Sequence, residues 1–239
     1  SLSPTAAAGT EPVHLCETFC EDLRTIAVMM KTTLLLLFSA SFASAAPATH
    51  PQRGVEQIVT SSGSPQIEVV VDPELRYLGT YRQPAMEGRA EFEQYVFADA
   101  RQRGLGRVFI VHFEHVLPGV DFSFKYPRFE MVRLGDHEYL HQSWPLEDWD
   151  LFRSPAMEQM LARDALQVPR TLLVDRYVRA LDGGKAEIIL FYIEPAGELP
   201  APAEDLGLAG AKRDLWKPIE GGLAERARAV FRVRDHGQR

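Results

Sequence analysis

Two stretches of the chain carry the same order of residue patterns, and this near-repetition limits the folds that the sequence can adopt. The strings "FEQYVFADARQ" (92–102) and "MEQMLARDALQ" (157–167) are identical at five of eleven positions. Their flanks also match at an offset of 62 to 65 residues, and we therefore predict an internal duplication. The matching flanks are "RYLGTY" (76–81) with "EYLHQSW" (138–144) and "RVFIVHFEHVL" (107–117) with "RTLLVDRYVRAL" (170–181).

The spacing of apolar residues predicts a helix in each repeat. Phe92, Tyr95 and Val96 fall on one face of a helix over 92–103. In the second repeat, Ser154 is a suitable N-cap, the proline after it suits the first helical position, and apolar residues again share one face. A C-terminal helix follows from apolar residues spaced i, i+4, i+7 and i+8 near residue 227.

The remaining apolar runs are short and rich in β-branched and aromatic residues, which predicts strands. The string "RLGDHE" (133–138) between two of these runs predicts a hairpin turn. Each repeat then reads strand, helix, strand, strand. We expect an α+β fold with a largely antiparallel sheet and two helices on one face, built from two βαββ repeats, plus the C-terminal helix. The expected divisions are a duplicated domain over 66–194 and a Pro/Ala linker with the C-terminal helix over 195–239.

This order of elements resembles the duplicated strand-helix-strand-strand modules of SOUL-type haem-binding proteins and of gyrase-inhibitor-like effector-binding domains. The resemblance covers roughly residues 66–194 and concerns element order, since no family motif is present. It implies binding of a small molecule, and it assigns no functional residue or cofactor. A ferredoxin-like βαββαβ domain is the alternative fold.

The segment "MKTTLLLLFSASFASAAP", which starts at Met30, has the layout of a secretory signal peptide. It has one basic residue, a short apolar run and an Ala-Ser-Ala ending at Ala45. We therefore expect residues 1–29 to be upstream sequence outside the native protein, 30–45 to be the signal peptide and 46–65 to be a disordered linker. The protein is then exported, to the periplasm or the extracellular space, with no stable membrane insertion after cleavage.

The composition of the chain after Ala45 limits the kinds of partner that the protein can bind. Its 29 acidic and 24 basic residues give a net charge of −5, which argues against a general nucleic-acid binder. Both cysteines, Cys16 and Cys20, precede the signal segment, so the expected mature chain has no disulfide or lipidation site. We expect a soluble protein; oligomeric state and cofactor stay unassigned.

Two sets of polar residues are candidates for catalysis. Aligning the strands at Val111 and Val174 places His112 beside Asp175 and Glu114 beside Tyr177, all four on one face. Imidazole and carboxylate groups perform acid/base chemistry, while the plain alternative is a sheet face open to water. The recurring Asp99 and Asp164 are the second set. For these we favour hydrogen bonds from backbone N–H groups of the following loop, or ion pairs with the arginines that open the next strands, Arg107 and Arg170.

Aromatic residues mark candidate ligand-binding positions. Phe124 and Tyr126 lie on one face of an alternating stretch, and Trp144 and Trp149 stand among acidic residues before the second helix. Four histidines fall between 112 and 141, but none has a metal-binding motif, so no metal site is assigned and one would have to be assembled across strands.

The function expected from these patterns is binding of a small molecule in a cleft of an exported α+β domain. A hydrolase or lyase that uses His, Glu and Asp for acid/base chemistry is one alternative. A structural envelope protein without a pocket is the other.

Overall fold

The computed structural model describes residues 57–61, 65–99, 104–126, 130–147, 149, 154–207 and 210–235. The chain divides into two units, Ser1–Pro47 and Ala48–Arg239, and all described residues belong to the second. The predicted upstream segment and signal peptide lie outside the described residues, so export stays a prediction. The segment 46–65, expected to be disordered, contains the strand β1 (Gln57–Thr60).

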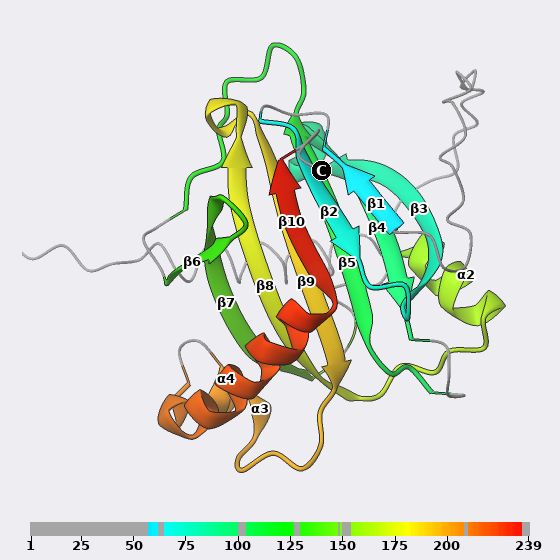
Figure 1. Ribbon diagram of the computed structural model, residues 1–239, viewed down its shortest axis with the longest axis vertical. Helices are drawn as coiled ribbons and strands as arrows, with labels where there is room; N and C mark the ends of the chain where they lie inside the picture. Colours follow the sequence, from blue (N-terminus) through cyan, green and yellow to red (C-terminus); the bar gives the residue numbers. More distant parts are fainter. Residues whose placement is uncertain are drawn as a thin grey trace, which may run out of the picture. The chain divides into compact units, whose positions relative to one another are not determined.

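Two antiparallel sheets form the described fold (Figure 1). The large sheet has seven strands in the order β3-β4-β5-β9-β8-β7-β6, and the small sheet has the order β1-β2-β10. The predicted α+β class with a largely antiparallel sheet is confirmed. The remaining strands are β2 (Ile67–Val71), β3 (Arg76–Ala85), β4 (Ala90–Ala98), β5 (Val108–Val116), β6 (Met131–Leu134), β7 (His137–Glu147), β8 (Thr171–Leu181), β9 (Ala186–Pro195) and β10 (Phe231–Asp235).

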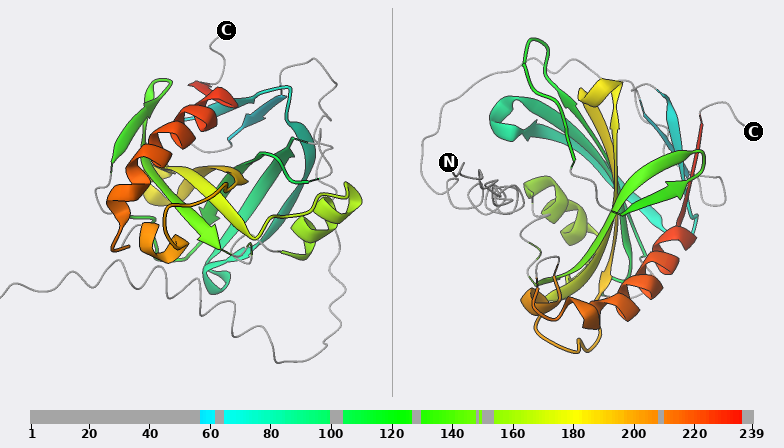
Figure 2. Two further views of the ribbon diagram at one scale, coloured as in Figure 1. Left: turned by 90° about the horizontal axis from the view of Figure 1, so that it is seen from below. Right: turned by 90° about the vertical axis from the view of Figure 1, so that its left-hand side faces the viewer.

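The helices lie on opposite faces of the large sheet. One face packs against α4 (Arg213–Ala229), α3 (Ala203–Leu206) and the small sheet, and we call it the α4 face. The other face packs against α2 (Pro155–Arg163), and we call it the α2 face. Figure 2 shows the two layers on either side of the curved strands. No helix in the described ranges is long and apolar enough to cross a bilayer.

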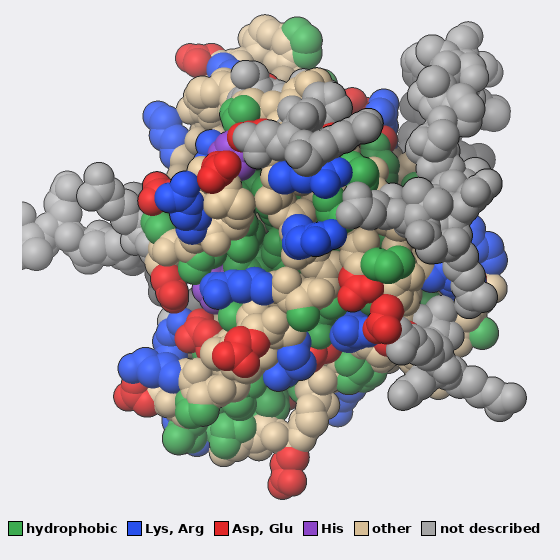
Figure 3. Space-filling view, viewed as in Figure 1, with side chains coloured by type: hydrophobic (Ala, Val, Ile, Leu, Met, Phe, Trp, Pro, Cys, Tyr) green, Lys and Arg blue, Asp and Glu red, His purple; other side chains and the backbone are tan. Residues whose placement is uncertain are grey.

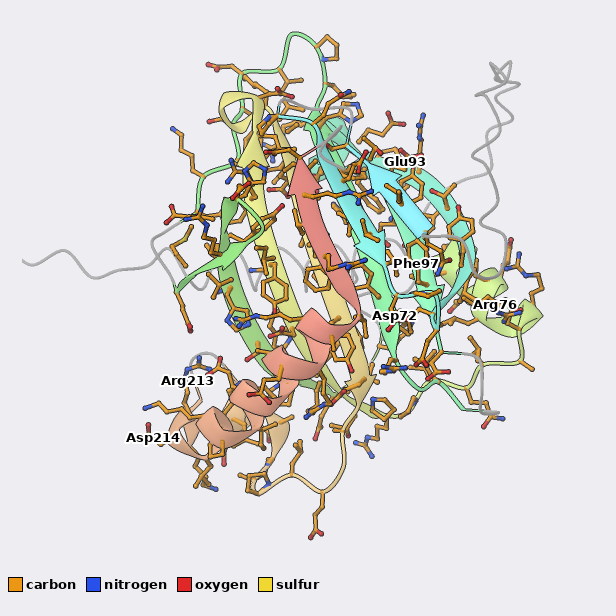
Figure 4. The ribbon with its side chains drawn as sticks, viewed as in Figure 1. Asp72, Arg76, Glu93, Phe97, Arg213 and Asp214 are labelled. Atoms are coloured by element: carbon orange, nitrogen blue, oxygen red, sulfur yellow. The ribbon has the colours of Figure 1, made fainter. Side chains whose placement is uncertain are left out.

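Alternation along the strands explains both cores, because successive side chains point to opposite faces. On the α4 face, the buried residues include Phe109, Leu190 and Trp216. Phe97 also points into the layer between the two sheets (Figure 4). On the α2 face, Val96, Ile110 and others pack under the helix. The strands β4, β5, β8 and β9 therefore bury side chains on both faces and read as nearly continuous apolar runs.

The helix predicted over 92–103 is wrong, because residues Ala90–Ala98 form strand β4. This strand pairs with β3 on one side and with β5 on the other. The first predicted βαββ unit consequently lacks its helix, and the structure does not confirm a βαββ duplication or two repeat helices on one face. Residues 100–103 lie outside the described part.

Other local predictions are confirmed. Ser154 caps α2, because its side chain accepts a hydrogen bond from the backbone N–H of Met157 at 3.1 Å. Residues Gly135 and Asp136 form the two-residue turn between β6 and β7. The predicted C-terminal helix is α4, although Phe231, expected on its apolar face, begins β10 instead.

Helix α2 sits where β3 allows close approach. A Cβ atom at Gly79 would lie 2.9 Å from the terminal methyl carbon of Met160, so a larger residue at this position would require the Met160 side chain to move. Arg163 donates a hydrogen bond to the backbone oxygen of Leu78, and Arg76 forms an ion pair with Asp164 at 2.7 Å (Figure 4).

Candidate functional site

The structure brings together two of the four predicted catalytic residues. His112 Nε2 lies 3.1 Å from Glu114 Oε2, and both side chains are buried on the α2 face. Asp175 and Tyr177 lie on the α4 face, where Tyr177 packs against Phe231 of the small sheet. The prediction that these four side chains share one face is therefore wrong.

A row of polar side chains crosses three neighbouring strands at His112. Tyr81, Gln94 and His112 are successive cross-strand partners on β3, β4 and β5. The Tyr81 hydroxyl donates to Gln94 Oε1, and Gln94 Nε2 lies 2.9 Å from His112 Nδ1. With the amide nitrogen donating to Nδ1, the imidazole carries its proton on Nε2 and donates it to Glu114.

Glu187 is the third ionisable side chain beside His112 and Glu114. Glu114 on β5 and Glu187 on β9 are direct cross-strand partners, and only 9% and 3% of their surfaces are exposed. His112, Glu114 and Glu187 each offer one ligand atom, and these three atoms lie within 4.8 Å of one another. This is the group that could hold a metal ion among the residues that the structure describes.

Tyr126 closes the site from the segment that follows β5. Its hydroxyl donates a hydrogen bond to Glu187 Oε2. Burial raises the pKa of Tyr126, and the nearby Glu187 carboxylate raises it further, so the phenol stays protonated and acts as a donor. We use the name His112 site for the set formed by Tyr81, Gln94, His112, Glu114, Tyr126 and Glu187.

Burial changes the ionisation of one carboxyl group of the site. It raises the pKa of Glu187 from 4.5 to about 8; the Tyr126 hydrogen bond opposes this, the charge of Glu114 adds to it, and Arg176 opposes it. Glu187 is therefore mostly protonated at neutral pH. Its carboxyl group and the imidazole Nε2 of His112 both lie close to the Glu114 side chain.

An aromatic and cationic border adjoins the site on β7 and β8. The Arg176 guanidinium lies 5.5 Å from the centre of the Trp144 ring and donates to Gln142 Oε1. The His112 ring stacks on Phe92 at 4.8 Å between ring centres and meets the edge of Phe191 at 6.3 Å. The site is thus polar at its centre and walled by rings.

Two of the four predicted ligand-binding residues lie at the His112 site, and two do not. Tyr126 belongs to the His112 site, and Trp144 lies on its border. Trp149 is buried in the apolar core under α2, and its neighbours 148 and 150–153 lie outside the described residues. Phe124 is buried and packs edge-on against Phe122, so it does not join the polar cluster.

The α4 face holds a separate buried polar group. His141 Nε2 lies 2.6 Å from Asp175 Oδ1, and the His141 ring stacks on Tyr177. Ser143 is nearby, but its hydroxyl donates to Glu220 at 2.7 Å and accepts from Trp216 Nε1 at 3.0 Å. Because the Ser143 hydroxyl makes these two bonds and not one to His141, the group is not a nucleophile triad.

The recurring aspartates form ion pairs. Asp99 Oδ2 lies 3.2 Å from Arg107, as the sequence favours. Asp164 pairs with Arg76 and Arg163 in place of the expected Arg170. These contacts support a structural role for both carboxylates.

Sequence reasoning missed Glu187 and Gln94. Glu187 is the second residue of the strand-like run "AEIILFYI" (186–193). An acidic residue so close to the preceding turn suggests an exposed strand end and not a buried site. Gln94 lies within the predicted helix 92–103, which the structure shows to be strand β4, so its position beside His112 could not be foreseen. The register of β5 against its neighbours, which only the fold supplies, joins both residues to His112.

Comparison of the chain with protein-family models, with curated proteins and with solved structures finds no match. The functional conclusion therefore rests on the His112 site.

Proposed function

We propose that this protein binds a small ligand at the His112 site, and that the ligand presents positive charge or hydrogen-bond donors to Glu114 and Glu187. The observation that carries the proposal is the direct cross-strand pairing of these two buried carboxyl groups. Two acidic side chains in directly opposed positions repel each other whenever both are ionised, and an uncompensated buried carboxylate costs several kcal/mol.

A structural role accounts poorly for this arrangement. An aliphatic pair at the two positions would extend the apolar core that Ile110 and Phe191 begin on the same face. The sites where a sequence departs from such packing rules are most often functional. A cationic ligand would neutralise Glu114 and the ionised form of Glu187 at once, which turns the cost of the pair into binding free energy.

The test is a thermal unfolding screen of the wild-type protein and the Glu187→Gln variant against divalent metal chlorides and small diamines such as ethylenediamine. A ligand at 100 times its Kd stabilises the folded state by about 2.7 kcal/mol, which for a chain of this size raises Tm by roughly 5–10 °C. The proposal predicts such a rise in the wild type and its loss in the variant. If no probe raises Tm, the proposal fails and a structural role becomes the better account.

One observation favours acid/base catalysis as a second candidate function. Burial raises the pKa of Glu187 to about 8, and a carboxyl group that stays protonated near neutral pH can act as a general acid beside a second carboxyl group. A hydrolase or lyase of this type would lose turnover in both Glu114→Gln and Glu187→Gln. Release of p-nitrophenol from nitrophenyl esters and glycosides between pH 5 and pH 9 provides the measurement.

The charges on the α4 face argue against this face being a nucleic-acid surface. Basic and acidic side chains are interspersed across it (Figure 3). A nucleic-acid surface would show basic residues gathered in one patch or stripe.

A further inference from the structure

We infer that the His112 site binds one divalent transition-metal ion of the Zn²⁺ type through His112, Glu114 and Glu187. The inference rests on the proposed function and names the chemical class of its ligand. It requires that the three side chains lie close enough to share one ion, that their donor atoms suit that ion, and that the surrounding groups tolerate the change of protonation.

The distances meet the first requirement. Zinc binds imidazole nitrogen and carboxylate oxygen at about 2.0–2.2 Å, so tetrahedral ligand atoms lie about 3.4 Å apart. His112 Nε2 and Glu114 Oε2 lie 3.1 Å apart, and all three ligand atoms fall within 4.8 Å. Small torsional changes of Glu187 therefore bring the third atom into range without moving a strand.

The donor atoms meet the second requirement. Imidazole nitrogen suits Zn²⁺ and its transition-metal neighbours, whereas Ca²⁺ and Mg²⁺ prefer sites made of oxygen alone. An organic ammonium ion would gain from the carboxylates but could not use a nitrogen that donates its own proton. Two carboxylates also balance the charge of a divalent ion in the buried sheet.

Gln94 meets the third requirement. A metal ion on His112 Nε2 moves the imidazole proton to Nδ1, which then needs an acceptor. The amide of Gln94 lies 2.9 Å from Nδ1 and can turn its oxygen to that position, and the Tyr81 hydroxyl can then accept from the amide nitrogen. The same three residues thus serve both forms of the site.

The experiment is isothermal titration of the full chain, freed of metal with EDTA, with ZnCl₂ at pH 7. We expect one Zn²⁺ per chain. Glu187→Gln and His112→Gln should weaken binding by more than about 100-fold, because losing even a group that only hydrogen-bonds to a metal ligand costs about 10–100-fold. The control is His115→Gln, on the same strand, whose exposed imidazole lies 3.6 Å from Glu91 and whose loss should leave binding unchanged.

Glu187→Gln keeps the test valid if His112→Gln fails to fold, because glutamine matches the shape of the glutamate side chain. The far-UV circular dichroism of each variant verifies the fold. Absence of stoichiometric Zn²⁺ binding, or an equal loss in His115→Gln, would overturn the inference. If diamines raise Tm and metal ions do not, the inference fails while the proposed function stands.

Discussion

Replacing Glu187 with glutamine should remove most of the pH dependence that the His112 site gives to folding stability. Glutamine keeps the shape of the side chain and can still accept the hydrogen bond that Tyr126 donates to Oε2. It cannot ionise. The change therefore isolates the free energy of forming a carboxylate in the buried strand β9.

The sign of the effect follows from the raised pKa. Between pH 4.5 and about pH 8 the carboxyl group of Glu187 is protonated in the folded chain and ionised in the unfolded chain. The folded state thus binds more protons, and stability falls as pH rises through this window. From pH 5 to pH 9 the wild type should lose about 4 kcal/mol relative to the variant, since each pH unit between the two pKa values corresponds to about 1.4 kcal/mol.

Urea denaturation followed by tryptophan fluorescence at pH 5, 6, 7, 8 and 9 provides the measurement for both proteins. All other ionisable groups are the same in the two proteins, so the difference between them isolates Glu187. A difference that stays within about 0.5 kcal/mol, the usual size of a neutral surface change, would refute the reasoning. In that case water reaches Glu187 and its pKa is not raised.

Two further predictions concern the neighbouring hydrogen bond and the contact between the two sheets. Tyr126→Phe removes the hydrogen bond that lowers the pKa of Glu187, so that pKa should rise above about 8. Carbon NMR of labelled Glu side chains would detect the change, and an unchanged pKa of Glu187 would contradict the prediction. Gly135→Ala places a Cβ atom 2.4 Å from a backbone oxygen of β10 and should destabilise the protein by more than about 3 kcal/mol, since strain and overpacking add. Gly119→Ala is the matched control, because Gly119 also has positive φ but meets no atom within 4 Å, and it should cost only about 1–2 kcal/mol in urea denaturation.

The features that the sequence predicts correctly are those set by local chemistry. The Ser154 cap, the Gly135 turn and the strand character of 108–116 each depend on a few adjacent residues. Hydroxyl capping, positive φ and β-branched composition act within one turn or one strand. These signals can therefore be recognised in the sequence without knowledge of the rest of the fold.

The error at 92–103 has a physical cause. Phe92, Tyr95 and Val96 have helical spacing, but β4 is an interior strand with buried residues on both faces. A strand covered on both sides shows no alternation, and a short apolar run of this kind resembles a helix by periodicity alone. The aromatic and β-branched content of the segment was the better guide.

The structure does contain a local similarity at another offset. The hairpin β3–β4 turns through η1 (Met86–Gly88), and the hairpin β8–β9 turns through η3 (Asp182–Gly184). The central residues of the two turns, Glu87 and Gly183, share left-handed backbone angles, with φ of 56° and 64°. In each hairpin an Ala-Glu pair opens the returning strand, and in the second of them that glutamate is Glu187.

Strand register explains why half of the candidate site was predictable. His112 and Glu114 are two residues apart on one strand, so alternation alone places them on the same face. Joining them to β8 needs the register through β9, where Tyr192 pairs with both Phe109 and Asp175. Asp175 therefore lies in the row of Phe109, an odd number of residues from His112, and points to the opposite face. A shift of one residue in an alignment of two strands reverses the face of every side chain, and the same register that removes Asp175 from the site brings Glu187 into it.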